Sequence, residues 1–161
     1  MSTSPAQPSS AQIDPRGPRF GAGITGVLLL VVIVLGLSGL TVAATTLFVV
    51  ITLLFGWGAF AGIRRHPYGL LYARLLRPRL SPPAELEDVA PPTFAQGVGF
   101  AITLIGLVLG LLGVPYAIVV AAGLAFVAAF LNSVFAFCLG CQIYLLLVRS
   151  RVIRGGGAAS A

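Results

Sequence analysis

The sequence predicts an all-α, polytopic membrane protein with four transmembrane helices in two hairpins, plus a short interfacial helix. Three observations favour this class. Of the 161 residues, 58% are hydrophobic and only 9% are charged, whereas soluble domains average about 25% charged residues. Four long stretches have no charged side chain, and the ten basic residues, all of them Arg, lie outside these stretches. The composition excludes a soluble globular enzyme, which could not bury so much apolar surface, and an intrinsically disordered chain.

The two ends of the chain have the composition of tails. Residues 1–12 are mainly Ser, Pro, Ala and Gln without charge, so we expect a disordered N-terminal tail. The membrane domain is expected over residues 13–149, and a flexible C-terminal tail is expected over residues 150–161.

The uncharged stretches have the length that a helix needs to cross a bilayer, about 20 residues. They cover approximately residues 21–40, 41–63, 94–113 and 116–136. Very short links join the first to the second and the third to the fourth, which predicts two tight helical hairpins. Apolar sequence continues past the fourth stretch as far as Arg149, so its end must bend or leave the hydrocarbon layer. We expect Gly140 to help that bend.

The loop between the hairpins, residues 64–93, has most of the charged residues. Tyr68 to Arg77 have helical periodicity, with Leu and Tyr on one side, which predicts a short helix in the membrane interface. His66 and the acidic residues around Glu87 are expected to be solvated. The arginines of the loop are expected at the membrane surface, with an anion or partner site as the alternative. They are Arg64, Arg65, Arg74, Arg77 and Arg79.

The arginines also predict the orientation of the protein. In a four-helix topology all ten lie on one side of the membrane. By the positive-inside rule, both termini and the central loop are then cytoplasmic, and the chain is a multi-pass protein of the plasma membrane. The expected partner of the +6 net charge is the lipid bilayer and not a nucleic acid, and a homo-oligomer is left open.

The two hairpins resemble one another as a weak internal repeat. Three matches share an offset of 74 to 76 residues. They pair Pro18 with Pro92, Phe60 with Phe135, and Tyr68 with Tyr144. Such a repeat predicts a pseudo-two-fold axis along the membrane normal.

Small and polar residues inside the stretches are candidate packing sites. Gly58 to Gly62 and Gly106 to Gly110 have the Gly-x-x-x-Gly spacing that lets membrane helices approach closely. Asn132 is a polar amide within the fourth stretch. We expect it to pair across the bundle, and the alternative is that it lines a substrate or quinone pocket.

Cys138 and Cys141 are the sharpest chemical feature of the sequence. Their i and i+3 spacing puts both on one face of a helix at the cytoplasmic boundary, at a separation compatible with a disulfide or a shared metal. They are candidate catalytic redox residues, since nearby Arg favours a nucleophilic thiolate. The alternative is a pair of small buried cysteines. Two Cys alone cannot complete a tetrahedral metal site, so a metal would need a dimer or a partner protein, and no cofactor is expected for the chain itself.

Several separated motifs resemble one family. They are Asp14-Pro15-Arg16-Gly17-Pro18-Arg19-Phe20, Pro67-Tyr68-Gly69-Leu70-Leu71, Arg77-Pro78-Arg79-Leu80, Pro91-Pro92-Thr93-Phe94-Ala95-Gln96, and Asn132 with Phe137-Cys138-Leu139-Gly140-Cys141. Over about residues 13–149 the chain resembles a bacterial, mainly actinobacterial, family of four-helix integral membrane proteins, the domain of unknown function 4395. The resemblance implies an association with thioredoxin-like proteins and thiosulfate sulfurtransferases, which fits thiol redox chemistry at the two Cys. It implies no established activity.

Three functions are compatible with these features. The first, which we expect, is an accessory membrane protein that is not an enzyme and docks partners of thiol or sulfur metabolism, such as a thioredoxin-like or sulfurtransferase protein. The second is a membrane thiol oxidoreductase that uses Cys138 and Cys141. The third is a small transporter subunit, although coupled ion sites usually need a charged residue that the spans lack.

Overall fold

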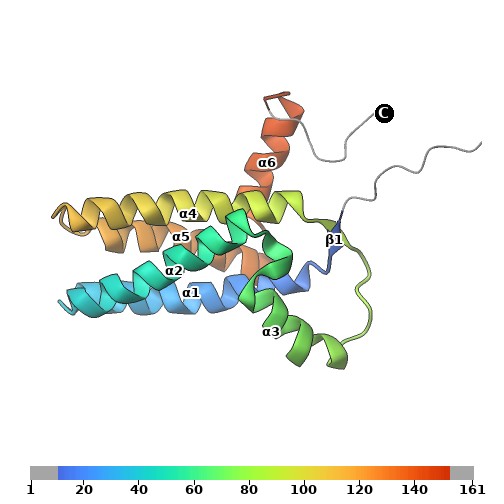
Figure 1. The fold of residues 1–161 in the computed structure, drawn as a ribbon, viewed down its shortest axis with the longest axis horizontal. Coiled ribbons are helices and arrows are strands. Elements are labelled where there is room, and N and C mark those ends of the chain that lie inside the picture. The colour runs from blue at the N-terminus through green and yellow to red at the C-terminus, as the bar shows by residue number, and fades with distance from the viewer. Residues whose placement is uncertain (1–10, 153–161) are drawn as a thin grey trace, which may run out of the picture.

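The computed structural model describes residues 11–152, and it is an all-α protein. Four of its helices are long and apolar enough to cross a membrane. They are α1 (Arg16–Leu37), α2 (Thr41–Phe60), α4 (Ala90–Leu111) and α5 (Ala117–Phe135), and they run side by side in Figure 1. The shorter elements are β1 (Gln12–Ile13), the 3-10 turns η1 (Ile63–Arg65) and η2 (Arg77–Arg79), α3 (Pro67–Leu75), β2 (Glu87–Asp88) and α6 (Leu139–Arg149).

The four long helices pack around an apolar core. Leu29 and Val32 of α1 meet Phe48 and Ile51 of α2, and Ala122 of α5 brings a small side chain into the same cluster. Each helix packs most extensively on the other hairpin, because α1 lies chiefly against α5 and α2 lies chiefly against α4. The two predicted hairpins therefore form one bundle and not two separate units.

Both hairpin turns have the same backbone conformation, with a left-handed glycine after the first helix. Gly39 and Gly113 have φ of +79° and +83°, the left-handed conformation that glycine adopts without strain. The residue after each glycine donates its N–H back into the last helical turn, from Leu40 to the Leu35 carbonyl at 2.9 Å and from Val114 to the Leu109 carbonyl at 3.0 Å. These bonds satisfy the last carbonyls of α1 and α4, as glycine-terminated helices commonly do.

The structure supports the internal repeat, with α1, α2 and α3 matching α4, α5 and α6. Phe60 and Phe135 each end a long helix, as the sequence alignment predicts. The ring of Phe20 lies 6.0 Å from that of Tyr72, and the rings of Phe94 and Tyr144 are 5.6 Å apart. Tyr144 thus matches Tyr72 and not Tyr68, which corrects the predicted pairing. The antiparallel pair of β1 with β2 joins the starts of the two repeats.

Several element boundaries differ from those expected. α1 and α4 begin before residues 21 and 94, because Pro18, Pro91 and Pro92 sit in first turns, where a backbone N–H has no helical acceptor and proline is tolerated. α2 ends before residue 63, since Gly62 turns the chain with φ +83°. The predicted tail of residues 1–12 includes Gln12, which pairs with Asp88 in the sheet formed by the two-residue strands β1 and β2. Residues 1–10 and 153–161, which include most of both predicted tails, lie outside the described part of the chain.

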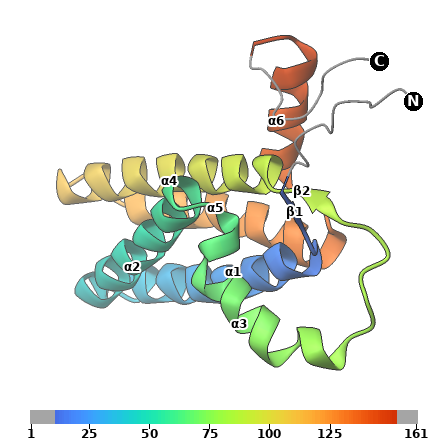
Figure 2. The same ribbon diagram turned by 45° about the vertical axis from the view of Figure 1, so that its right-hand side comes forward.

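The short helices α3 and α6 leave the bundle at one end. Both lie opposite the hairpin turns, and α6 points away from the long helices (Figures 1 and 2). α3 packs on α1 and α6 packs on α4. The bend before α6 is at Ala136, whose φ of +56° is left-handed, and not at Gly140 as expected. Gly140 instead lies so close to α4 that an added Cβ would stand 2.6 Å from Ala95 Cα.

One of the two predicted Gly-x-x-x-Gly motifs packs helices at both of its glycines. An added Cβ at Gly106 would overlap Ala121 of α5, and one at Gly110 would lie 2.7 Å from Ile118 Cγ1. In the other motif only Gly58 has this role, against Gln96 of α4. Gly62 has open space around its missing side chain and serves as the turn that ends α2.

Candidate functional site

Cys138 and Cys141 form a disulfide at the beginning of α6, with their Cα atoms 5.2 Å apart. The expectation that both lie on one helical face is wrong, since Cys138 precedes the helix with extended φ and ψ of −86° and 101°. Cys138 is the N-cap residue, and the backbone N–H of Cys141 donates to its Sγ at 3.3 Å. The sulfurs therefore lie at the positive end of the α6 dipole.

Cys138 borders a cavity of about 620 Å³ at the same end of the bundle. Its lining comes from all five helices α1 to α5, from the start of α6, and from the short elements β1, η1 and η2. Its inner wall is apolar, with Ile102, Leu124 and Ala125, and its outer part carries charged groups such as Asp14 and Arg77. This size and mixture are typical of small-molecule sites.

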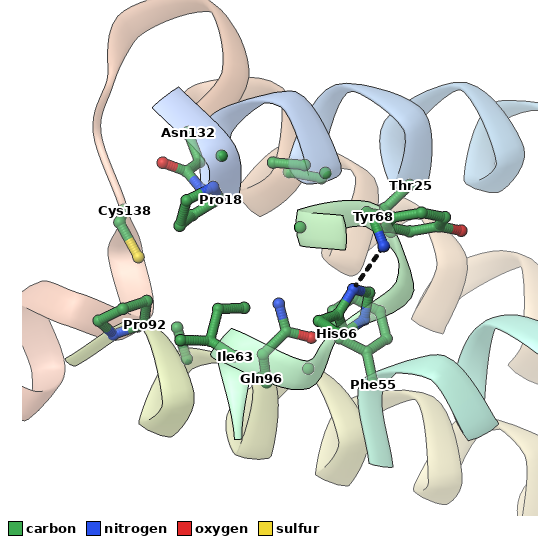
Figure 3. A pocket seen from close by; sticks show the side chains of 18 of the residues that line it. Pro18, Thr25, Phe55, Ile63, His66, Tyr68, Pro92, Gln96, Asn132 and Cys138 are labelled. Carbon is green, nitrogen blue, oxygen red and sulfur yellow. Dashed lines mark hydrogen bonds between the residues drawn. The ribbon is translucent and has the colours of Figure 1, made fainter. Parts of the chain in front are cut away.

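Two side-chain amides point into this cavity. Figure 3 shows Asn132 of α5 and Gln96 of α4 on opposite sides of an open space, with the Cys138 sulfur directed into it. Within residues 11–152 neither amide has a hydrogen-bond partner, and no polar side-chain atom of that range is both sealed from solvent and unpaired. The predicted partner for Asn132 across the bundle is thus missing from the described residues. The amide faces the cavity, which was the alternative.

His66 forms another wall of the cavity and is 4% exposed, so the expectation of a solvated histidine is wrong. It is the N-cap residue of α3, where its Nδ1 accepts from the Tyr68 N–H at 3.3 Å. Its Nε2 lies 3.2 Å from the Leu54 carbonyl. One ring nitrogen must accept and the other must donate, so these contacts define a neutral imidazole with its proton on Nε2. Burial lowers the pKa of His66, against the hydrogen bond to Leu54.

A polar network connects α1 to α3 at the mouth of the cavity. Tyr72 Oη donates to Asp14 Oδ2 at 3.1 Å, and Arg16 Nε lies 3.1 Å from Asp14 Oδ1. Arg16 also donates to the Ser81 carbonyl at 2.9 Å, which fixes the loop beyond η2. Burial raises the pKa of Asp14, but the hydrogen bonds from Arg16 and Tyr72 outweigh it and hold the pKa below its ordinary value. Burial and the Asp14 carboxylate together raise the pKa of Tyr72.

The five arginines of the central loop are all exposed, around η1, in α3 and in η2. Arg64 and Arg77 also reach the cavity mouth. Among residues 11–152 the one salt bridge is that of Arg16 with Asp14, so the loop arginines have no acidic partner in the described chain. Of the acidic cluster, Asp88 is part of β2 and accepts from the Ala90 N–H at 2.8 Å.

No metal site is formed by the described residues, since no group of three or more His, Cys, Asp or Glu comes together between residues 11 and 152.

A family model described as a domain of unknown function (DUF4395) matches residues 13–149. The chain belongs to the DUF4395 family. The match runs from Ile13 in β1 to the last residue of α6 and so covers both repeats and all of the cavity lining except Gln12. No curated protein and no solved structure matches the chain.

Three cavity residues of this DUF4395 chain were not recognised as site residues from the sequence. In the sequence, Gln96 is only part of the family motif, Tyr72 is only part of an apolar helix face, and His66 is predicted to be solvated. A signal for His66 was present, because His-Pro before a helical segment is compatible with an N-cap followed by Pro at the first helical position.

Proposed function

We propose that this DUF4395 protein is a membrane thiol–disulfide redox protein in which Cys138 and Cys141 alternate between a disulfide and a dithiol. The observation that carries the proposal is the location of the pair. A Cys-x-x-Cys pair at a helix N-terminus, with the first Cys as the N-cap, is the arrangement in which a thiolate is best stabilised. Its opening onto the cavity gives the sulfur access to a reaction partner.

Cys138 is the proposed attacking thiol and Cys141 the resolving thiol. In the dithiol state Cys138 retains the backbone N–H of Cys141 as a donor to its sulfur. The partner is a soluble thioredoxin-like or sulfurtransferase protein, and thiol exchange is the reaction: the attacking thiolate forms a mixed disulfide, which the second thiol resolves.

We place the reaction at the cytoplasmic face of the plasma membrane. Nine of the ten arginines lie in the described chain, and all nine occur at the end of the bundle where α3 and α6 leave it. The positive-inside rule puts that end in the cytoplasm.

The test is a redox titration of the purified protein in detergent or lipid nanodiscs. After equilibration in glutathione or dithiothreitol buffers, free thiols are counted by alkylation and mass shift. We expect a single two-electron transition that is lost in Cys138→Ser and in Cys141→Ser, with all variants folded. A disulfide that no accessible buffer reduces without unfolding contradicts the proposal.

A second candidate, docking of an acidic partner without redox chemistry, is favoured by the exposed loop arginines. The two candidates are distinguished by which Cys variants retain a partner protein in cells. In the redox case Cys141→Ser retains a mixed disulfide to a partner through Cys138, whereas docking alone retains the same partner when both Cys are replaced by Ser.

A further inference from the structure

The cavity has a gradient of polarity along the bundle. Ile102 is twelve residues beyond the start of α4, which at 1.5 Å per residue is roughly 18 Å along the helix. The opposite end carries Asp14, Arg64 and Arg77. Because the deep wall is made of Ile, Leu and Ala, the cavity fits an amphiphile with its polar head at the mouth and its apolar part toward the middle of the bilayer.

The two amides indicate what kind of polar head group the cavity binds. Gln96 and Asn132 are half-buried and have no protein hydrogen-bond partner among the described residues, so both amides are available to a ligand in the cavity. Each offers N–H donors, and they approach the same space from α4 and α5 (Figure 3). Gly58 makes room for Gln96, because an added Cβ there would lie 2.9 Å from the Gln96 Oε1. Two donors on opposite sides match a flat ring with two carbonyl oxygens.

The Cys138 sulfur beside the two amides indicates which reaction a ring bound between them would undergo. A dithiol that opens onto a cavity within the bilayer needs a two-electron acceptor that is soluble in the membrane. We propose that the cavity binds an isoprenoid quinone, with the ring between Gln96 and Asn132 beside Cys138, and that this quinone oxidises the Cys138–Cys141 dithiol. The electron donor is the one given by the proposed function, on which this inference rests.

The reaction is balanced in atoms and electrons. The dithiol loses two S–H bonds and gains one S–S bond, and it releases two electrons and two protons. The quinone takes both electrons, and one proton bonds to each of its carbonyl oxygens, which gives the quinol. A partner dithiol then reduces the new disulfide by thiol exchange and returns the protein to its starting state.

Binding is tested without electron transfer in the Cys138→Ser, Cys141→Ser double variant. The probe is ubiquinone with a single isoprene unit, titrated by calorimetry into protein in nanodiscs. We expect saturable binding that Gln96→Leu and Asn132→Leu each weaken about five- to ten-fold, the value of one hydrogen bond. Gln142→Leu is the matched control, because Gln142 is exposed on α6 and is not a cavity residue, and its affinity stays unchanged.

Two binding results would overturn the proposal. One is equal affinity in all variants, and the other is competition by geraniol, an isoprenoid alcohol without the ring, as effective as the quinone. Thermal unfolding of each variant without ligand establishes that a lost affinity is not a lost fold.

Electron transfer is tested with the reduced native chain under anaerobic conditions. We expect one quinol, followed by its absorbance, for each disulfide formed, and a rate that Gln96→Leu reduces and Gln142→Leu does not. If the glutathione titration shows a reversible dithiol but the quinone leaves it reduced, this inference fails and the proposed function stands. If the titration shows no dithiol couple, the proposed function fails and the quinone step fails with it, whatever the binding result.

Discussion

His66 and Cys138 occupy the same position in the two halves of the bundle. Each follows the end of a long helix, is the N-cap residue of a short one, and offers a side-chain atom to a backbone N–H of the first turn. His66 accepts from Tyr68 and Cys138 accepts from Cys141, both at 3.3 Å. Both residues line the central cavity. The repeat thus places a neutral imidazole acceptor in one half where the other half has the Cys138 sulfur.

The buried imidazole makes the stability of the fold depend on pH. Because burial lowers the pKa of His66 in the folded protein, the unfolded chain binds the proton first as pH falls. The stabilisation is therefore complete above the ordinary pKa of 6.5 and is lost as pH falls from there through the folded pKa. We expect the melting temperature in detergent to decline between pH 7.5 and pH 5, and His66→Asn, which keeps a capping acceptor, to decline less.

The Asp14 carboxylate does not account for that decline. Its pKa is lowered in the folded protein, so its contribution is present above its ordinary value of 3.8 and is lost only at lower pH. A decline of equal size in His66→Asn would show that His66 is not the source.

Loss of the hydrogen bond between Tyr72 and Asp14 should weaken the attachment of α3 to α1. Tyr72→Phe keeps the ring contacts with Gly17 and Phe20 and removes only the hydroxyl. The expected loss is about 1–2 kcal/mol, since the acceptor is charged and partly buried. Tyr116→Phe is the control, because Tyr116 is 68% exposed, and chemical denaturation of both variants is the measurement. Equal stability of the two variants would mean that the hydroxyl contributes nothing.

Two Gly→Ala substitutions are expected to act in opposite directions. At Gly140 the new methyl group meets the backbone of Ala95, which cannot move without shifting α4, and we expect a loss of about 1–3 kcal/mol. At Gly123, in the middle of α5, nothing lies within 4 Å of the added Cβ, so Ala should stabilise the helix by up to about 1 kcal/mol. Melting curves measure both. If Gly140→Ala is as stable as the native chain, α6 is not packed on α4 in this way.

Orientation is tested by placing single cysteines in the double Ser variant of Cys138 and Cys141. Ser38→Cys lies in the exposed turn between α1 and α2, and Arg79→Cys lies at the other end in η2. A maleimide that cannot cross the membrane should label only Ser38→Cys in intact cells and should label both after lysis. Labelling of Arg79→Cys in intact cells would invert the topology and would put the proposed dithiol outside the cell.

The fold was largely predictable because its determinants are local. A run such as that of α5, apolar from end to end, has no other reasonable structure in a bilayer. The reversal of the chain at Gly39 and Gly113 follows from the shortness of the links. The helix starts were less predictable, since the sequence does not show whether a proline near the start of a helix lies in its first turn or before it.

The candidate site was predictable only in part because its geometry is not local. The spacing of Cys138 and Cys141 marks them as a pair, but the left-handed backbone at Ala136, which ends α5 before Cys138, has no sequence signal. Gln96 becomes a cavity residue only through the packing of α2 on α4, where Gly58 admits it. His66 is buried against Leu54 of α2 and beside the cavity, so its burial depends on packing between elements that the local sequence does not specify.

The small sheet made by β1 and β2 has a mechanical consequence. An antiparallel ladder looks the same after half a turn, so it can straddle the symmetry axis and tie the two repeats together without favouring either. Gln12, Ile13 and Leu86 border the hollow beneath it. Because Gln12 and Ile13 belong both to the paired segment and to the cavity lining, separating the two strands would loosen the tie between the repeats and widen the cavity at the same time.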